Sequence, residues 1–141
     1  MLVNLVNLNL CSMSIMVEKD LFEYLKERVY PDLVMSTNPI SRWDCYSPVK
    51  QHRIELKCRK THYDELIVEK AKFAALLDKA IDNFDVPMYI NSTPKGVYRW
   101  NLFFQNPHWF KKYLPKTTDF SNTNKITKEI AMLPVFGAEV L

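Results

Sequence analysis

The feature that most limits how this chain can fold is a pair of segments, 41–47 and 52–60, in which polar and apolar residues alternate. Pro48 and a short polar linker separate them, and this spacing predicts a β-hairpin. If the turn is centred between Val49 and Lys50, Asp44 stands opposite Glu55. Alternation then places one set of side chains on a polar face: Arg42, Asp44, Tyr46, Glu55 and Lys57. The other face is apolar and belongs to the core, and it carries Trp43, Cys45, Ile54, Leu56 and Cys58.

Asp44 and Glu55 are therefore like charges that face each other, with Cβ atoms roughly 5 Å apart. Such a pair destabilises a sheet unless a cation lies between the two groups. Mg²⁺ is usually held by one or two carboxylates with water and substrate phosphate, so the pair predicts a metal site. The main-chain carbonyl of Leu56 is a further candidate ligand. Lys57 is expected beside the metal, where it can orient or deprotonate an attacking water.

The alternative interpretation of these acids is a solvent-facing strand on which neighbouring bases neutralise the two carboxylates. Four such bases are present: Arg42, Arg53, Lys57 and Arg59. A Glu-x-Lys tripeptide also occurs often by chance. The facing register and the helix expected after the hairpin favour the site.

The remaining pattern predicts helices and strands around this hairpin. Apolar residues at a spacing of four indicate an amphipathic helix from about 17 to 30, which Pro31 ends. Residues 66–68 are expected to form a third strand, and a second amphipathic helix begins at Lys70. Strands are expected at 86–91, 97–103 and 126–133. This order predicts an α/β or α+β domain in which helices flank one sheet.

Asp44 followed by Glu55-Leu56-Lys57, between two helices, resembles the PD-(D/E)XK nuclease superfamily, which has the restriction-endonuclease-like fold. The resemblance runs from about Glu18 to Leu102, and the segment 114–128 is similar to small bacteriophage nucleases of this type. It implies a central mixed β-sheet flanked by helices in the order α-β-β-β-α-β. It also implies Mg²⁺-dependent hydrolysis of DNA phosphodiester bonds, with Mn²⁺ as a substitute, and a homodimer for members that cut both strands.

The resemblance assigns roles residue by residue. Asp44 matches the first acidic position, although it follows Trp43 instead of proline, and Glu55 and Lys57 match the (D/E)-x-K pair. Glu18 is the best candidate for the glutamate that many members carry in the first helix. The basic residue at the start of the second helix is either Lys72 or Lys70, and the helical angle does not decide between them. The dipeptide 31–32, Pro-Asp, ends a helix and is not the motif.

The positive charge of the chain is concentrated in one stretch. Residues 95–128 carry seven lysines and arginines against a single acid, Asp119, whereas residues 1–94 are close to neutral. This excess suggests a polyanionic partner, which we expect to be DNA. Aromatic residues interleave with the bases of this stretch, and three of the bases are the candidate phosphate contacts: Lys111, Lys112 and Lys116. A solvated basic face is the alternative.

Several classes of protein are excluded. Only two glycines occur, Gly96 and Gly137, so the chain has no P-loop, dinucleotide-binding fingerprint or nucleophile elbow. Three widely spaced cysteines make a disulfide scaffold improbable and favour a cytoplasmic protein, in the host cytoplasm if a phage encodes it. The three histidines have no zinc-ligand spacing.

The first sixteen residues carry no charge, lack the basic region of a secretory signal and are too short to span a membrane. We expect residues 1–16 to be a disordered tail, or to precede a true start at Met13 or Met16, and residues 17–141 to form one nuclease-like domain. Two other functions remain open: a catalytically inactive DNA-binding or phage assembly protein on the same fold, and a phage structural protein that neither binds nor cuts DNA.

Overall fold

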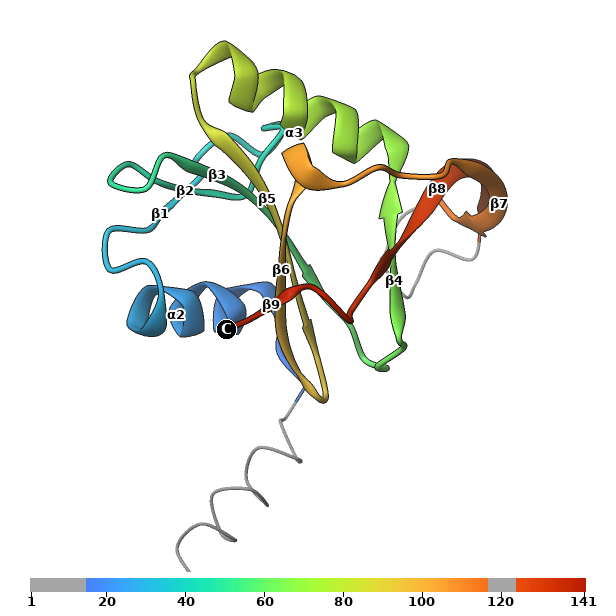
Figure 1. Ribbon diagram of the computed structural model, residues 1–141, viewed down its shortest axis with the longest axis horizontal. Helices are drawn as coiled ribbons and strands as arrows, with labels where there is room; N and C mark the ends of the chain where they lie inside the picture. The colour runs from blue at the N-terminus through green and yellow to red at the C-terminus, as the bar shows by residue number, and fades with distance from the viewer. Residues whose placement is uncertain (1–14, 117–123) are drawn as a thin grey trace, which may run out of the picture.

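The computed structural model describes residues 15–116 and 124–141, so all but the last two residues of the tail expected at 1–16 lie outside the described residues. The main sheet has six strands in the order β1-β2-β3-β5-β6-β9 (Figure 1). Their bounds are β1 Val34–Met35, β2 Cys45–Ser47, β3 His52–Cys58, β5 Val86–Thr93, β6 Gly96–Asn101 and β9 Glu139–Val140. Strands β3 and β5 are parallel and the other pairs are antiparallel, so the sheet is mixed, as expected.

A second sheet has three strands in the order β4-β8-β7, with β4 at Glu65–Glu69, β7 at Phe110–Pro115 and β8 at Lys125–Pro134. The sequence predicted a single sheet with the 66–68 strand in it, and this prediction was wrong. Strand β4 pairs with β8, far along the chain, instead of with the hairpin. The parallel pair β3 and β5 needs a crossover connection, and β4 with the following helix supplies it away from the main sheet.

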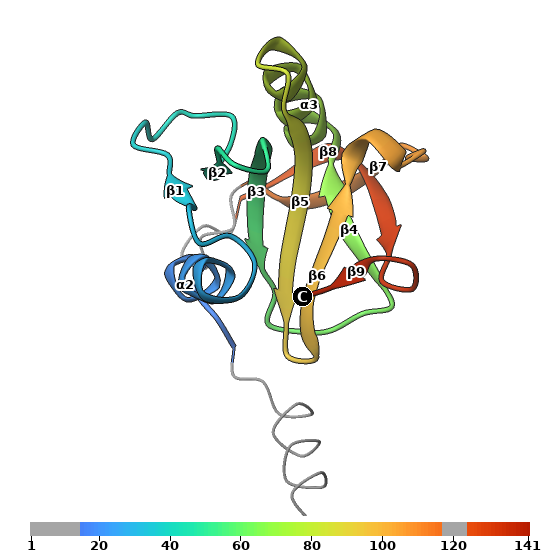
Figure 2. The ribbon, with the colours of Figure 1, turned by 60° about the vertical axis from the view of Figure 1, so that its left-hand side comes forward.

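Two helices cover the two faces of the main sheet. Helix α2 (Glu18–Arg28) buries Leu21 and Leu25 against Ile54 and Ile90. Helix α3 (Lys70–Asp82) buries Phe73 and Leu76 on the other side, together with the second sheet and the 3-10 helix η1 at Leu102–Phe104. Figure 2 shows β3, β5 and β6 side by side at the centre of the molecule. Because both faces are covered, β3 and β5 are almost wholly buried.

The order of elements matches the expected α-β-β-β-α-β arrangement, with the two-residue strand β1 added after α2. Helix α2 begins where the Asp20 carboxylate accepts a hydrogen bond from the Val17 amide (3.0 Å). It ends at Arg28, two residues earlier than expected and before Pro31. Among the described helices none is long and apolar enough to cross a membrane.

The hairpin has the register that the sequence predicted: Cys45 pairs with Ile54, Tyr46 with Arg53 and Ser47 with His52. Strand β2 starts at Cys45 and not at 41, so Asp44 lies just before it. The Asp44 amide donates to the Ile54 carbonyl (2.8 Å), although Ile54 pairs with Cys45. Two successive residues thus meet one residue of β3, which is the arrangement of a β-bulge.

The bulge corrects one prediction about the faces of the hairpin. Trp43 was expected on the apolar face with Cys45, but it lies on the opposite face, where it packs near Tyr46 (ring centroids 6.3 Å apart). An extra residue in one strand reverses the alternation beyond it, so Trp43 moves to the side of Tyr46 and Arg53. The other four residues assigned to the apolar face do pack in the core beneath α2: Cys45, Ile54, Leu56 and the half-buried Cys58.

Candidate active site

The Asp44 side chain is held at the end of β2 by the neighbouring strand. The Leu56 amide donates a hydrogen bond to Asp44 Oδ2 (2.7 Å). The bulge and this bond together direct the carboxylate towards β3, just before β2 begins, where the pairing of β2 with this edge of β3 stops. The Pro31-Asp32 dipeptide, which the sequence excluded as the motif, lies at the other end of the hairpin. There Asp32 accepts hydrogen bonds from the Ser47 hydroxyl (2.9 Å) and the Val49 amide (2.8 Å), so it fastens the turn.

Glu55 is the buried acid of the pair, with 9% of the residue exposed. Its carboxyl group lies within hydrogen-bond reach of that of Asp44. The pKa of Glu55 is raised to about 7. Burial is the largest cause of this shift, and the charge of Asp44 is the next. Lys72 works in the opposite direction. Two acids therefore crowd each other with one ammonium group in contact, and an additional cation between them would relieve the repulsion.

Of the two lysines left open by the sequence, Lys72 contacts the site and Lys70 does not. Lys72 Nζ lies 3.2 Å from Glu55 Oε1, whereas Lys70 Nζ lies 3.2 Å from Glu129 Oε2 on β8. Burial alone would lower the pKa of Lys72, but the carboxylates of Glu55 and Asp44 outweigh it and raise the pKa above its usual value. Lys72 is therefore firmly cationic beside the acids.

Lys57 follows Glu55 by two positions on β3 and is half-buried. The pKa of Lys57 is lowered, mainly by burial and next by the positive charge of the Arg59 guanidinium. The carboxylates of Glu69 and Glu55 oppose this shift. A lysine whose ammonium form is less favoured gives up a proton more readily, which suits a group that exchanges protons with water.

Glu18 is the first residue of α2 and is exposed. Partial burial, followed by the Asp44 charge, raises the pKa of Glu18, and Lys72 and Lys57 lower it. Its charge therefore acts on the same group of residues, although no hydrogen bond joins Glu18 to them among the described residues. The helix thus brings a third acid to the edge of the site, as the resemblance implied, without bringing it into contact.

The donor set fits a divalent metal that keeps water and substrate in its coordination shell. Within the described ranges, no three acidic, histidine or cysteine side chains gather closely enough to form a metal cage. Two carboxylates suffice for Mg²⁺, which is usually bound through one or two of them. Amide and carbonyl of one strand residue point to the same edge, so the Leu56 carbonyl is directed towards the Asp44 side.

The sequence missed a buried ion pair behind the bulge. Arg53 donates to Asp85 Oδ2 through Nε (3.0 Å) and through a terminal nitrogen (2.6 Å). Its guanidinium stacks on Trp43 (4.6 Å to the ring centroid) and on Tyr46 (4.1 Å). The pair depends on the parallel contact of β3 with β5, and no local pattern signals that contact.

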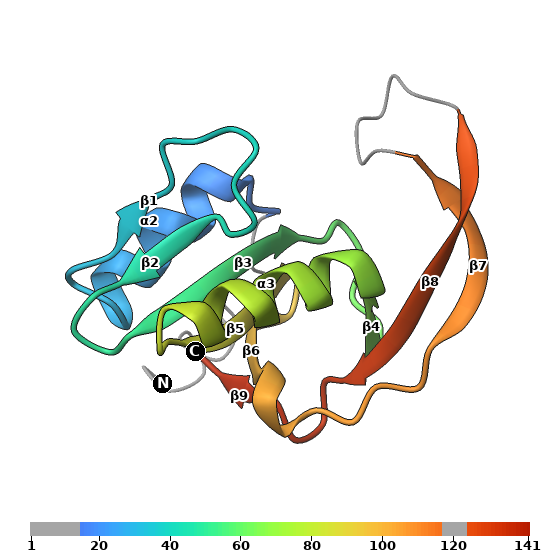
Figure 3. The same cartoon turned by 90° about the horizontal axis from the view of Figure 1, so that it is seen from above.

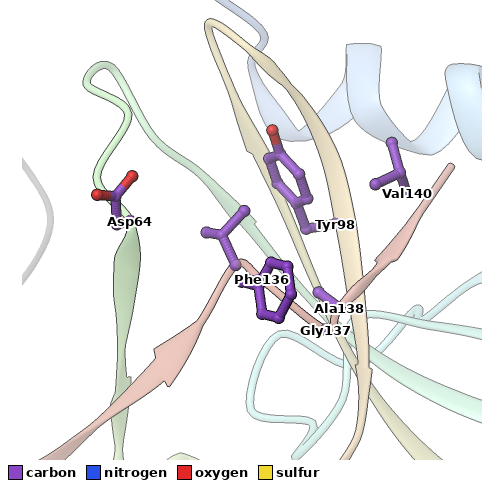
Figure 4. A pocket seen from close by; sticks show the side chains of 7 residues that line it. Asp64, Tyr98, Phe136, Gly137, Ala138 and Val140 are labelled. Atoms are coloured by element: carbon purple, nitrogen blue, oxygen red, sulfur yellow. The ribbon is translucent and has the colours of Figure 1, made fainter.

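The described cysteines and two of the histidines have contacts of their own outside the acid pair. Cys45 and Cys58 are free thiols, and burial raises the pKa of both. His52 bonds the Tyr30 hydroxyl and His62 the Thr93 hydroxyl. Lys111, Lys112 and Lys116 are exposed on and just after β7. The hollow in Figure 4 is lined by residues such as Asp64, Tyr98 and Phe136, and no candidate site residue lines it.

The mixed sheet with α2 on one face and α3 on the other is the restriction-endonuclease-like α+β fold, and this prediction is confirmed. No family model and no curated protein matches the chain. Among solved structures it is similar to Archaeoglobus fulgidus Hjc, a Holliday junction resolvase from an archaeal hyperthermophile. The TM-score is 0.51 at 16% sequence identity, over 84% of this chain and 96% of the other. At this identity the likeness shows the fold.

Proposed function

We propose that this protein is a metal-dependent nuclease of the PD-(D/E)XK type that hydrolyses DNA phosphodiester bonds. One observation carries the proposal: two carboxyl groups, those of Asp44 and Glu55, meet at the free edge of β3 with Lys72 in contact and Lys57 two residues further on. The likeness of the fold to a DNA junction resolvase supports it.

Asp44, Glu55 and the main-chain carbonyl of Leu56 would hold the metal, with Glu18 reaching it through water. A bound Mg²⁺, or Mn²⁺ in its place, would polarise the scissile phosphate and lower the pKa of an attacking water. Asp44 can keep its orientation during this work because the Leu56 amide fixes one of its oxygens. Its other oxygen is left to face the metal.

Lys57 and Lys72 would have different roles in the reaction. In its neutral amine form, which burial makes more accessible, Lys57 would orient the attacking water and accept its proton as the new bond to phosphorus forms. The P–O bond to the leaving strand would break in the same step, and the leaving oxygen would take a proton from water. Lys72 Nζ would stay charged, favour the ionised form of Glu55 and offer its remaining N–H groups to a phosphate oxygen. No covalent intermediate with the protein is required.

The exposed lysines of β7 would contact phosphates and position the DNA without reading its sequence. The solved neighbour acts on Holliday junctions, so branched DNA is the first substrate to test, beside duplex and single strands. Cutting both strands of a branch would suit a homodimer. The free thiols fit a cytoplasmic location, in the host cell if a phage encodes the protein.

The test is cleavage of labelled branched, duplex and single-stranded DNA with Mg²⁺ or Mn²⁺. We expect wild type to cut and Asp44→Ala and Lys57→Ala to lose at least about 100-fold in rate. Lys79→Ala, at the far end of α3, is the matched control and should cut normally. Equal cutting by wild type and both site variants would refute the assignment. Binding without cutting, unaffected by Asp44→Ala, would instead indicate an inactive DNA-binding protein.

A further inference from the structure

The strands β7 and β8 extend beyond the rest of the molecule. Within the described ranges, strand β4 pairs only with residues 130–134 of β8, so β7 and the part of β8 before residue 130 continue as a two-stranded ribbon. We call residues 110–116 and 124–130 the arm, and Figure 3 shows it reaching away from the two helices. A two-stranded ribbon on its own is marginally stable, so its orientation depends on contacts at its base.

Two ion pairs fix the base of the arm to the start of α3. Lys128 Nζ lies 2.5 Å from Glu69 Oε1, and Glu129 Oε2 lies 3.2 Å from Lys70 Nζ. The two pairs have reversed polarity and involve neighbouring residues on each side. They therefore hold the arm in a defined orientation to α3, the helix that also carries Lys72 into the site.

The register of the arm separates its lysines into two faces. Lys112 stands directly opposite Lys128, and Lys111 stands directly opposite Glu129. Directly opposed residues share a face, so Lys112 lies on the face of the Glu69 contact. Like charges in this position are unfavourable, and Glu69 neutralises only one of them. Lys111, in contrast, stands directly opposite an acid, Glu129, which also contacts Lys70.

The face with Lys112 and Lys128 leads to the candidate site. The Glu69 carboxylate that binds Lys128 is close enough for its charge to act on both Lys57 and Lys72. Lys72 in turn contacts Glu55. Glu69 therefore links this face of the arm to the lysines of the candidate site, and we take this as the direction in which a DNA strand bound at Glu55 continues.

We infer that Lys112 and Lys128 together bind a backbone phosphate of the DNA, so that the arm holds the substrate strand beside the Asp44–Glu55 site. The inference rests on the proposed function and adds to it the path of the DNA strand on the protein. A phosphate between the two ammonium groups supplies the negative charge that this cross-strand pair lacks. Such a contact positions the DNA and is independent of base sequence.

The test is DNA binding in metal-free buffer as a function of salt, with Lys112→Ala compared with Lys111→Ala. Both change one exposed lysine of the same strand, and only the face differs. We expect Lys112→Ala to lower the slope of log K against log salt by about 1, and Lys112→Arg to restore it. Lys111→Ala should have the smaller effect. Lys128→Gln should behave like Lys112→Ala, provided that its circular dichroism spectrum shows a folded protein.

Equal effects of Lys112→Ala and Lys111→Ala, or no effect of either, would overturn the inference. Cleavage by the same proteins separates this failure from failure of the proposed function. If wild type cuts DNA and Lys112→Ala binds and cuts like wild type, the nuclease assignment stands and the role of the arm is wrong. If wild type neither binds nor cuts, both are wrong.

Discussion

The buried carboxyl group of Glu55 meets that of the half-buried Asp44. Asp44 is fixed by the Leu56 amide, and Glu55 is fixed by its position on a buried strand. Neither can turn away to relieve the repulsion. Two carboxylates that repel each other in the absence of a cation are suited to binding one, and their repulsion has measurable consequences.

Glu55→Gln is expected to stabilise the metal-free protein at alkaline pH. The pKa of Glu55 is raised from 4.5 to about 7 in the folded state, so folding favours its protonated form. The wild type therefore loses stability as pH rises from about 4.5 to about 7, by on the order of 3 kcal/mol. Glutamine never ionises, and it can still accept a hydrogen bond from Lys72.

Urea denaturation with EDTA at several pH values measures this difference. The variant and the wild type should have equal free energies of unfolding near pH 4.5. Between pH 4.5 and pH 7 the variant should become the more stable of the two, and it should remain so above pH 7. Added Mn²⁺ at pH 8 should stabilise the wild type and leave Glu55→Gln unchanged. If the variant were less stable than wild type at pH 8 without metal, ionisation of Glu55 would not destabilise the protein, and the prediction would be contradicted.

Lys72→Met should raise the pKa of Glu55 further, because it removes the ammonium group 3.2 Å from the carboxylate. Lys70→Met should leave the Glu55 titration where it is, since Lys70 contacts Glu129 instead. Carboxyl carbon NMR shifts during a pH titration report this directly. We also expect Lys72→Met to reduce kcat/KM by roughly tenfold, the effect of about 1.4 kcal/mol. Equal titration curves for the two variants would contradict the role given to Lys72.

Much of this site follows from the sequence because a hairpin is local. Its register depends on turn length, and the position of Pro48 and the linker was enough to bring Asp44 to Glu55. The helices followed from the spacing of residues such as Leu21, Leu25, Phe73 and Leu76. The choice between Lys70 and Lys72 was beyond the sequence, because spacing from Leu76 favoured Lys72 whereas helical angle placed Lys70 nearer the apolar face.

What the sequence did not reveal depends on contacts between distant segments. The pairing of β4 with β8 joins residues more than sixty positions apart, and nothing in 65–69 distinguishes it from a strand of the main sheet. The bulge at Asp44 and the displaced Trp43 follow from one extra residue, which alternation cannot show. Arg53 and Asp85 look like surface charges in the sequence, yet both are buried.

Arg53→Met is expected to destabilise the protein by about 3 to 5 kcal/mol, because it leaves Asp85 as a buried charge without its partner. Arg99→Met is the control, because its partner Glu139 is more than half exposed and can return to water. The double variant Arg53→Met, Asp85→Leu should recover much of the loss. Urea denaturation measures all three, and a loss below about 1 kcal/mol for Arg53→Met would contradict the importance of this pair.

The most direct test of the central claim is calorimetric titration of Mn²⁺ into the protein at pH 8, without DNA. We expect wild type to bind Mn²⁺ at the Asp44–Glu55 pair, and Asp44→Asn, which can keep the hydrogen bond from the Leu56 amide, to lose that binding. Asp32→Asn, which changes the acid at the other end of the hairpin, should bind like wild type. Unchanged binding by Asp44→Asn, or none by wild type, would contradict a metal site between these two acids.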